Sequence, residues 1–389
     1  MIIELHLLQS FPTSNLNRDD VGQPKTVTFG GVTRGRISSQ CLKRSARTQF
    51  TRFGLGEDET GVRTKRLLLA TARILDGRTE GEPAAETKEI VREGLRRLGF
   101  KVAEKDLTQY LFFLGREAAE HLADYCRRHR DALEKAAAAR RDEEKKKRKG
   151  SKEKDSSPDA AAVEEARRIL SAGRAADIAL FGRMIANNRD FNVDAASQVA
   201  HAISTHAVAT EFDYYTAVDD LKAAEADEDA GADMIGTVDF NAACYYRYAN
   251  VDLGQLERNL DIRADDDDVV ERAAKAWIKA FAVATPSGKQ NSMAAHTRPE
   301  ALLAVVRDHG AWNLANAFLK PVEGTDIMGE STERMLAHFS DLNAFYGSGE
   351  IKAVVGASPT GALPLDGADS VASLDAFTDR TVAAALEKR

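Results

Sequence analysis

The sequence predicts an α+β protein in which a large helical insertion interrupts a split βαβ fold. Strand-like patterns occur at 2–8, near 27–32 and at 236–253. Between the second and the third, apolar residues recur at helical spacing over 57–135. Another helical pattern, at 269–284, follows the last strand. The order is therefore β–loop–β–α before the insertion and β–α–β after it, which is close to a split βαβ sandwich.

The first predicted elements are a strand, a long loop and a second strand. Residues 2–8 (IIELHLL) begin with alternation and then become apolar, which indicates a strand that is at least half-buried. The loop that follows, FPTSNLNRDDVGQPK, is rich in Pro, Asn, Asp and Gly and is long for a connection. Long ordered loops are often functional. The second strand is interrupted by Gly30 and Gly31.

The next element is a helix that begins at Ser38 or Ser39, because either side-chain oxygen can accept from an unpaired N–H of the first turn. Arg47 is four residues from Lys43 and three from Arg44, so the three charges are expected to share one helical face. Like charges on one face repel, so the pattern costs stability unless an anion lies there. A solvated helix face is the alternative interpretation.

The rest of the chain is patterned unevenly. Residues 140–160 are low in complexity and carry both charges, which indicates an exposed segment; a basic arm that touches nucleic acid is the less favoured interpretation. Helical patterns resume over 161–188 and 195–208, and a last helix is expected near 299–309. Beyond about residue 345 the chain is only weakly patterned.

Composition limits the class of protein. Of 389 residues, 43% are hydrophobic and 30% charged, so the chain is globular. Three distant cysteines form no CxxC pair and predict free thiols in a reducing compartment. The N-terminus lacks a basic leader region, and no apolar run reaches the roughly 18 residues of a membrane span. We therefore expect a cytoplasmic protein without leader or membrane anchor.

Charge is distributed unevenly along the chain. The net charge of −7 alone argues against a nucleic-acid binder. Residues 1–52, however, hold eight Lys or Arg against three Asp or Glu, and residues 211–239 hold ten Asp or Glu against one Lys. A basic face could thus follow phosphates while the acidic block lies elsewhere.

Signatures of enzymes are mostly missing. The sequence contains no GxGxxG, GxxxxGK[ST] or GxSxG motif. His201 and His206 are five residues apart, which is not the spacing of a zinc protease, so a core or interface role is favoured. Asp19 and Asp20 could hold Mg²⁺ or act as a general base, but an Asx-turn or a salt bridge with Arg18 accounts for them more simply.

Several features together favour nucleic-acid binding. Ser38 and Gln40 can donate hydrogen bonds to phosphate or sugar. They lie at the N-terminus of a predicted helix, and the helix dipole favours an anion at that end. Lys289 lies in a second glycine-containing loop, SGKQNS. The tyrosines of the YYRY stretch at 245–248 could stack on bases, although neighbouring strand residues face opposite ways and at least one belongs to the core. Six cations lie within 23 residues, namely Lys25, Arg34, Arg36, Lys43, Arg44 and Arg47.

A series of motifs in a fixed order resembles one family, the backbone subunit of type I-E CRISPR Cascade complexes (the CasC-type subunit of the RAMP superfamily). The resemblance extends over roughly residues 1–320. It rests on SNLNRDD (14–20), FGG (29–31), RISSQCLKR (36–44), ALFGRM (179–184), AHAISTH (200–206), YTAVDDL (215–221), YYRYANVDL (245–253), GKQ (288–290) and ANAF (315–318).

The resemblance implies an RRM-like palm of the ferredoxin-like split βαβ type, with a large helical fingers insertion and an extended thumb hairpin. It assigns 1–56 and 236–345 to the palm, 57–180 to the fingers with the exposed segment near 140–160, and 181–235 to the thumb region. Residues 346–389 form a C-terminal extension that matches nothing in the family.

The resemblance also implies a function without enzymatic activity or cofactor. Copies would polymerise head-to-tail into a helical ribonucleoprotein filament along a CRISPR RNA and present the guide to target DNA in antiviral defence. The expected partners are further copies of the same chain and four other Cascade subunits: the large subunit, the small subunit, the guide 5′-end cap and the guide-processing subunit. No association with a membrane is expected. The RNA contacts carried over are Arg18, Lys25, Ser38, Gln40, Lys43, Arg44, Arg47, Met184, Lys289 and Gln290, with a core methionine as the alternative at 184.

The sequence is also compatible with other functions. Related backbone subunits of type III complexes cleave RNA with an acidic loop residue, so a metal-dependent ribonuclease using Asp19 or Asp20 is the alternative function. An enzyme that acts on a phosphate-containing metabolite is a third possibility, but the sequence lacks the P-loop and Rossmann motifs that such enzymes carry. The acidic block, which includes Asp219 and Asp220, either faces the basic surface of the next subunit or lies in a solvated loop.

Overall fold

The computed structural model describes residues 1–146, 160–170, 175–185, 191–217, 234–260, 268–347 and 349–387. The chain divides into two compact units. Unit 1 comprises Met1–Gly54, Ser197–Gly254 and Asp268–Arg389, and unit 2 comprises Leu55–Ala196 and Gln255–Asp267. Across the described ranges, no helix combines the length and the apolarity that crossing a membrane requires.

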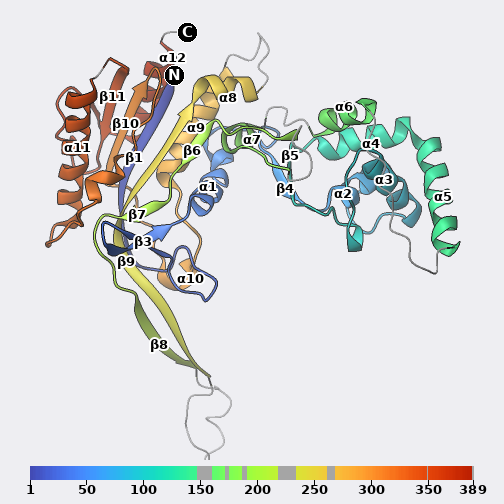
Figure 1. Cartoon of the computed structure of the whole chain (residues 1–389), viewed down its shortest axis with the longest axis horizontal. Coiled ribbons are helices and arrows are strands. Elements are labelled where there is room, and N and C mark those ends of the chain that lie inside the picture. The colour runs from blue at the N-terminus through green and yellow to red at the C-terminus, as the bar shows by residue number, and fades with distance from the viewer. Residues whose placement is uncertain are drawn as a thin grey trace, which may run out of the picture. The chain divides into compact units, whose positions relative to one another are not determined.

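A ten-stranded sheet forms the centre of unit 1 (Figure 1). Its strand order is β12-β11-β10-β1-β9-β7-β3-β2, and β6 and β8 also pair with β9. All pairs are antiparallel except β11 with β12. The strands are β1 (Ile2–Ser14), β2 (Thr26–Phe29), β3 (Val32–Ile37), β6 (Ser197–Val199), β7 (Ala202–Ser204), β8 (Glu211–Ala217), β9 (Met234–Asp252), β10 (Ala301–Arg307), β11 (Ile351–Ala357) and β12 (Asp369–Val371).

Helices cover both faces of this sheet (Figure 1). On one face, Phe281 of α9 accepts through its backbone carbonyl from the Arg247 guanidinium of β9. On the other, Met335 and Phe339 of α11 pack against Leu8 of β1. The helices of this unit are α1 (Ser39–Arg47), η1 (Phe50–Phe53), α8 (Leu253–Asn259), α9 (Asp268–Val283), α10 (Gln290–Met293), η5 (Leu314–Phe318), α11 (Ile327–Tyr346) and α12 (Leu374–Leu386), and α8 continues into unit 2.

The helical pattern predicted over 195–208 is wrong, because β6 and β7 lie there. The prediction of a helix near 299–309 is also wrong, because this stretch forms the strand β10. All seven residues of β10 are buried, and the strand lies between β1 and β11. A strand that is buried on both faces shows no polar alternation, and a short apolar run of this kind cannot be distinguished from a helix by periodicity. The weakly patterned residues after 345 contribute β11, β12 and α12 to unit 1.

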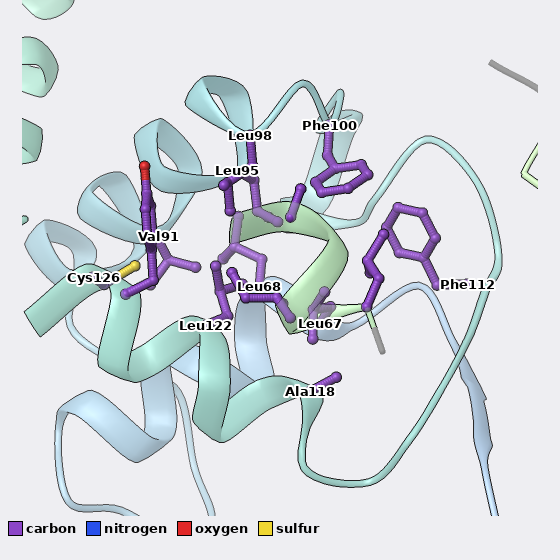
Figure 2. Packing of buried hydrophobic residues seen from close by; sticks show 14 of the residues in the cluster. Leu67, Leu68, Val91, Leu95, Leu98, Phe100, Phe112, Ala118, Leu122 and Cys126 are labelled. Carbon is purple, nitrogen blue, oxygen red and sulfur yellow. The ribbon is translucent and has the colours of Figure 1, made fainter. Parts of the chain in front are cut away.

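Unit 2 is mainly helical, as the spacing over 57–135 predicts. Figure 2 shows its core, in which Leu68 of α2, Val91 and Leu95 of α3 and Leu122 of α4 lie together. Its elements are β4 (Val62–Thr64), α2 (Leu67–Leu75), α3 (Ala85–Arg97), η2 (Glu104–Asp106), β5 (Phe112–Leu114), α4 (Ala118–Arg128), α5 (Arg130–Lys146), α6 (Ala160–Ile169) and α7 (Ala176–Phe181). Most of the charged segment 140–160 lies outside the described residues.

A two-stranded hairpin extends from the sheet of unit 1. Strand β8 pairs with the first residues of β9, from Glu211 opposite Phe240 to Ala217 opposite Met234. Every residue of β8 is exposed. Asp219, Asp220 and most of the acidic block lie in 218–233, outside the described residues.

Candidate nucleic-acid interface

A surface pocket of about 810 Å³ in unit 1 brings together half of the predicted RNA contacts. Its walls are the loop after β1, the first turns of α1 and the loop before α10. Arg18, Lys25, Ser38, Gln40 and Arg44 all line it. The three sequence segments that carried these residues are thus neighbours in space.

The loop after β1 is held by its own short polar side chains. Asp19 Oδ1 accepts hydrogen bonds from the backbone N–H groups of Val21 (3.0 Å) and Gln23 (2.9 Å), which is an Asx-turn arrangement. Asn17 Oδ1 accepts from the backbone N–H of Ser38 at 2.8 Å and so ties the loop to the start of α1. The Asx-turn interpretation of Asp19 is therefore confirmed.

The loop before α10 packs against the same segment through Gly288. A β-carbon at this position would lie 2.4 Å from the carbonyl oxygen of Leu16 and 2.6 Å from that of Asn15. Only glycine fits this approach without movement of the backbone. Lys289 and Gln290, which follow, do not themselves line the pocket, although their neighbours Ser287 and Gly288 do.

Helix α1 presents its N-terminus to the pocket. Ser38 is the N-cap, and its Oγ accepts from the Cys41 N–H at 3.4 Å, which resolves the predicted choice between Ser38 and Ser39. Ser38 is only 5% exposed, so little of its side chain faces the pocket. Gln40 and Arg44, one turn apart, are exposed beside it.

The structure corrects the expectation that Lys43, Arg44 and Arg47 share one face of α1. Arg44 lines the pocket, whereas Lys43 and Arg47 do not. A step of about 100° per residue places 43 and 47 beside the face that carries 40 and 44. Lys43 and Arg47 are half-buried, and neither is free of other interactions.

Three cations, Arg18, Lys25 and Arg44, line the pocket together with the carboxylates of Asp19 and Asp20. In the part of the chain that the structure describes, Arg18, Lys25 and Arg44 form no ion pair with a carboxylate. Burial raises the pKa of the Cys41 thiol, and the charges of Lys25 and Arg44 oppose that shift. Unpaired cations beside a helix N-terminus form a suitable site for a phosphate group.

Two groups of predicted contacts turn out to be structural. Arg34 is fully buried and donates to the carbonyls of Ser204 (3.0 Å) and Phe318 (2.8 Å), so it holds the fold together. Tyr245, Tyr246 and Tyr248 are buried, so none of them offers a ring to a base.

Met184 lies in unit 2 and is 83% exposed, so the interpretation as a core methionine is wrong. The preceding residue, Arg183, is buried and donates to the carbonyls of Leu170 (2.6 Å) and Phe191 (2.9 Å). This anchor holds the backbone in place while the Met184 side chain projects outwards.

Sequence reasoning missed further features. Arg36 and the exposed His201 are joined by a hydrogen bond of 3.1 Å, which only the register of the β3–β7 pair could have indicated. Phe212 and Tyr214 on β8 are 72% and 57% exposed. Within the described segments, no group of three His, Cys, Asp or Glu side chains is placed to hold a metal ion.

Comparison with known proteins places the chain in a family. The model of the Cas family described as CT1975-like proteins matches residues 3–380. The chain belongs to this family. No curated protein sequence matches this chain.

Two solved structures resemble this CT1975-like protein over 99% of its length and all of theirs. One is described as "CRISPR RNA-guided surveillance complex, pre-nicking", with 29% identity and a TM-score of 0.81. Another is described as "CRISPR RNA-guided surveillance complex", with 25% identity and a TM-score of 0.69. The similarity therefore includes both units of the chain.

Proposed function

We propose that this protein is a CRISPR RNA-binding backbone subunit of a type I-E Cascade surveillance complex. The observation that carries the proposal is the pocket at the N-terminus of α1, which is lined by the cations Arg18, Lys25 and Arg44. The similarity to chains of RNA-guided surveillance complexes supports it. The guide would present its bases to target DNA, and the protein would read only backbone and shape.

The topology of unit 1 supports an RRM-like palm. Elements β1, α1, β7, β9, α9 and β10 occur in this order along the chain, with other elements between them, and form a βαββαβ series. The four strands lie in the order β10-β1-β9-β7 and pair antiparallel. This is the split βαβ pattern, in which unit 2 would be the fingers insertion.

The hairpin of β8 and β9 is suited to the role of a thumb. Phe212 and Tyr214 alternate along β8 and therefore share one face, where Ile235 of β9 is also 60% exposed. Exposed aromatic side chains on a projecting strand are the groups on which unpaired bases stack. Contacts of this kind would repeat along the guide as copies assemble head-to-tail with the other subunits in the cytoplasm.

The proposed role is binding without catalysis or cofactor. Both Asp19 and Asp20 line the pocket, but Asp19 Oδ1 accepts two hydrogen bonds that serve the turn, so exposed Asp20 is the better candidate for the alternative ribonuclease function. Two neighbouring carboxylates, one of them engaged in a turn, are a poor match for the metal sites of such enzymes, which share several oxygen ligands.

The test is co-expression with a CRISPR array and the other subunits, followed by purification and sequencing of bound RNA. We expect guide RNA of defined length, and loss of that RNA when Lys25 and Arg44 are both changed to Glu. Arg380→Glu on α12 is the matched control, because Arg380 is exposed but ion-paired with Asp369. Periodic cleavage of complementary RNA with Mg²⁺, abolished by Asp20→Asn, would support the ribonuclease instead. Absence of bound RNA in the assembled complex would overturn the proposal.

A further inference from the structure

A second group of cations lies beside the pocket, on the hairpin of β2 and β3. The backbone N–H of Arg36 donates to the carbonyl of Lys25 at 2.8 Å, one position beyond the pair of Thr26 with Gly35. Residues directly opposite each other on antiparallel strands share a face, so the two cationic side chains are neighbours. Like charges in this arrangement destabilise a hairpin.

The third member of the group is His201, which immediately precedes β7. Its Nδ1 lies 3.1 Å from Arg36 Nη1. A guanidinium can only donate, so Nδ1 must accept, and the ring is therefore neutral with its proton on Nε2. The His201 side chain is exposed, which leaves this Nε2–H available to an incoming acceptor.

The surroundings of His201 are cationic. Partial burial lowers the pKa of His201, and the charges of Arg36 on β3 and Lys25 before β2 lower it further. Strands β6 and β7, on either side of it in the chain, contain no charged residue. Across the described ranges, neither Arg36 nor Lys25 is ion-paired with a carboxylate.

We propose that Lys25, Arg36 and His201 form a second phosphate subsite for the RNA, and that occupation of this subsite is coupled to uptake of one proton by His201. The inference rests on the proposed RNA-binding function. Lys25 also lines the pocket, so one cation joins the two subsites. Adjacent phosphates of one strand could thus be held by α1 and by the β2–β3 hairpin.

The coupling follows from charge. In the free protein, protonation of His201 would break its hydrogen bond with Arg36 and place a third positive charge in the group. A bound phosphate offsets that charge and accepts from both residues, so it raises the pKa of His201. At a pH between the pKa of His201 in the free protein and its pKa in the complex, the complex holds one proton more than the separate protein and RNA. Affinity for RNA should therefore increase as the pH falls, by up to about tenfold per pH unit.

The test measures binding of single-stranded RNA, carrying a pH-insensitive fluorescent label, to the full chain between pH 7.5 and 5.5. His201→Gln keeps a neutral hydrogen-bonding side chain but cannot titrate. Whatever its affinity at pH 7.5, we expect this variant to lose the gain in affinity that wild-type protein shows at pH 5.5. Arg36→Ala should weaken binding at every pH and lower the salt dependence by about one phosphate's share, a slope of about 0.7. His309→Gln is the control, because His309 is exposed and paired with Glu350.

The outcomes separate the two proposals. Wild-type binding that gains affinity at low pH, with the gain lost only in His201→Gln, supports the subsite. Wild-type binding that is salt-dependent but has the same pH profile as His201→Gln overturns the subsite and leaves the RNA-binding function standing. No binding to wild-type protein at any pH, even at low salt, would overturn both.

Discussion

The Nδ1 atom of His6 lies 2.9 Å from the hydroxyl oxygen of Tyr246, in the middle of the sheet of unit 1. The same hydroxyl accepts from the backbone N–H of Leu314 at 2.9 Å, so its own proton is free to donate to His6. His6 is therefore a neutral acceptor at this position. It is fully buried, and this burial, together with the nearby charge of Arg307, lowers its pKa to about 3.

The first prediction concerns the stability of unit 1 in acid. Since the folded pKa of His6 is depressed from 6.5 to about 3, the unfolded chain takes up a proton below pH 6.5 that the folded chain does not. The free energy of unfolding should fall by about 1.4 kcal/mol per pH unit in that window from this residue alone. His6→Gln should remove this part of the pH dependence, whatever its effect at neutral pH.

Urea unfolding followed by tryptophan fluorescence measures the stability of unit 1, because both tryptophans of the chain, Trp277 and Trp312, belong to that unit. The quantity to compare is the difference in stability between pH 7.5 and pH 5.0. Equal differences for wild type and His6→Gln would contradict the assignment, and exposed His309→Gln should behave as wild type.

The second prediction concerns the contact of Gly288 with Leu16. Gly288→Ala places a β-carbon 2.4 Å from a carbonyl oxygen, so the loop before α10 must move. We expect a loss of about 1–3 kcal/mol in stability, which is typical of overpacking, together with weaker RNA binding. Gly349→Ala is the control, because a β-carbon there meets nothing within 4 Å. Equal midpoints of unfolding for the two variants would show that the contact is not tight.

The third prediction concerns the pocket cation Arg44. Arg44→Ala should weaken binding of all guide sequences alike and lower the slope of log affinity against log salt concentration by about 0.7, the share of one single-strand phosphate. Arg380→Ala, at a position that is ion-paired on α12, should leave the slope unchanged. A loss confined to particular guide sequences would instead indicate contact with bases.

The fourth prediction uses Cys41 as a reporter of the pocket. Cys41 lines the pocket and is partly exposed, whereas Cys126 and Cys244 are buried and burial raises the pKa of Cys126 to about 12. Iodoacetamide should therefore label Cys41 first, and bound RNA should slow that labelling several-fold. Peptide mass spectrometry identifies the site, and Cys41→Ser verifies it. Labelling at an unchanged rate with saturating RNA would place the RNA elsewhere.

The sequence predicted those parts of the fold whose signals are local. The N-cap at Ser38 and the amphipathic helix α9 depend on neighbouring residues, and both are present. The local pattern of β10 does not distinguish it from a helix, because its burial depends on strands far away in the chain. Helix α11 was missed because its pattern is weak, although it covers one face of the sheet.

At the candidate site too, the sequence predicts features that depend on nearby residues and fails for those that depend on distant ones. The resemblance pointed to the loop after β1, to α1 and to the loop before α10, and the pocket brings these segments together. Composition could not show that Arg34 bonds to backbone carbonyls, that Arg44 and Lys43 occupy different faces, or that Arg36 is paired with His201. Those properties depend on strand register and on packing between segments remote in sequence.

The position of β1 in the sheet has a consequence for synthesis of the protein. This strand is made first, yet it pairs with β9 and with β10, whose residues emerge from the ribosome more than 200 positions later. At about 5–20 residues per second, its apolar residues wait roughly 15–60 s for β10. Residues 55–196, in contrast, supply nearly all of unit 2 in one continuous stretch and can fold during this delay. The nascent chain therefore has to protect one aggregation-prone strand until its last partner arrives, and truncated products that end before β10 should be substrates for chaperones and proteases.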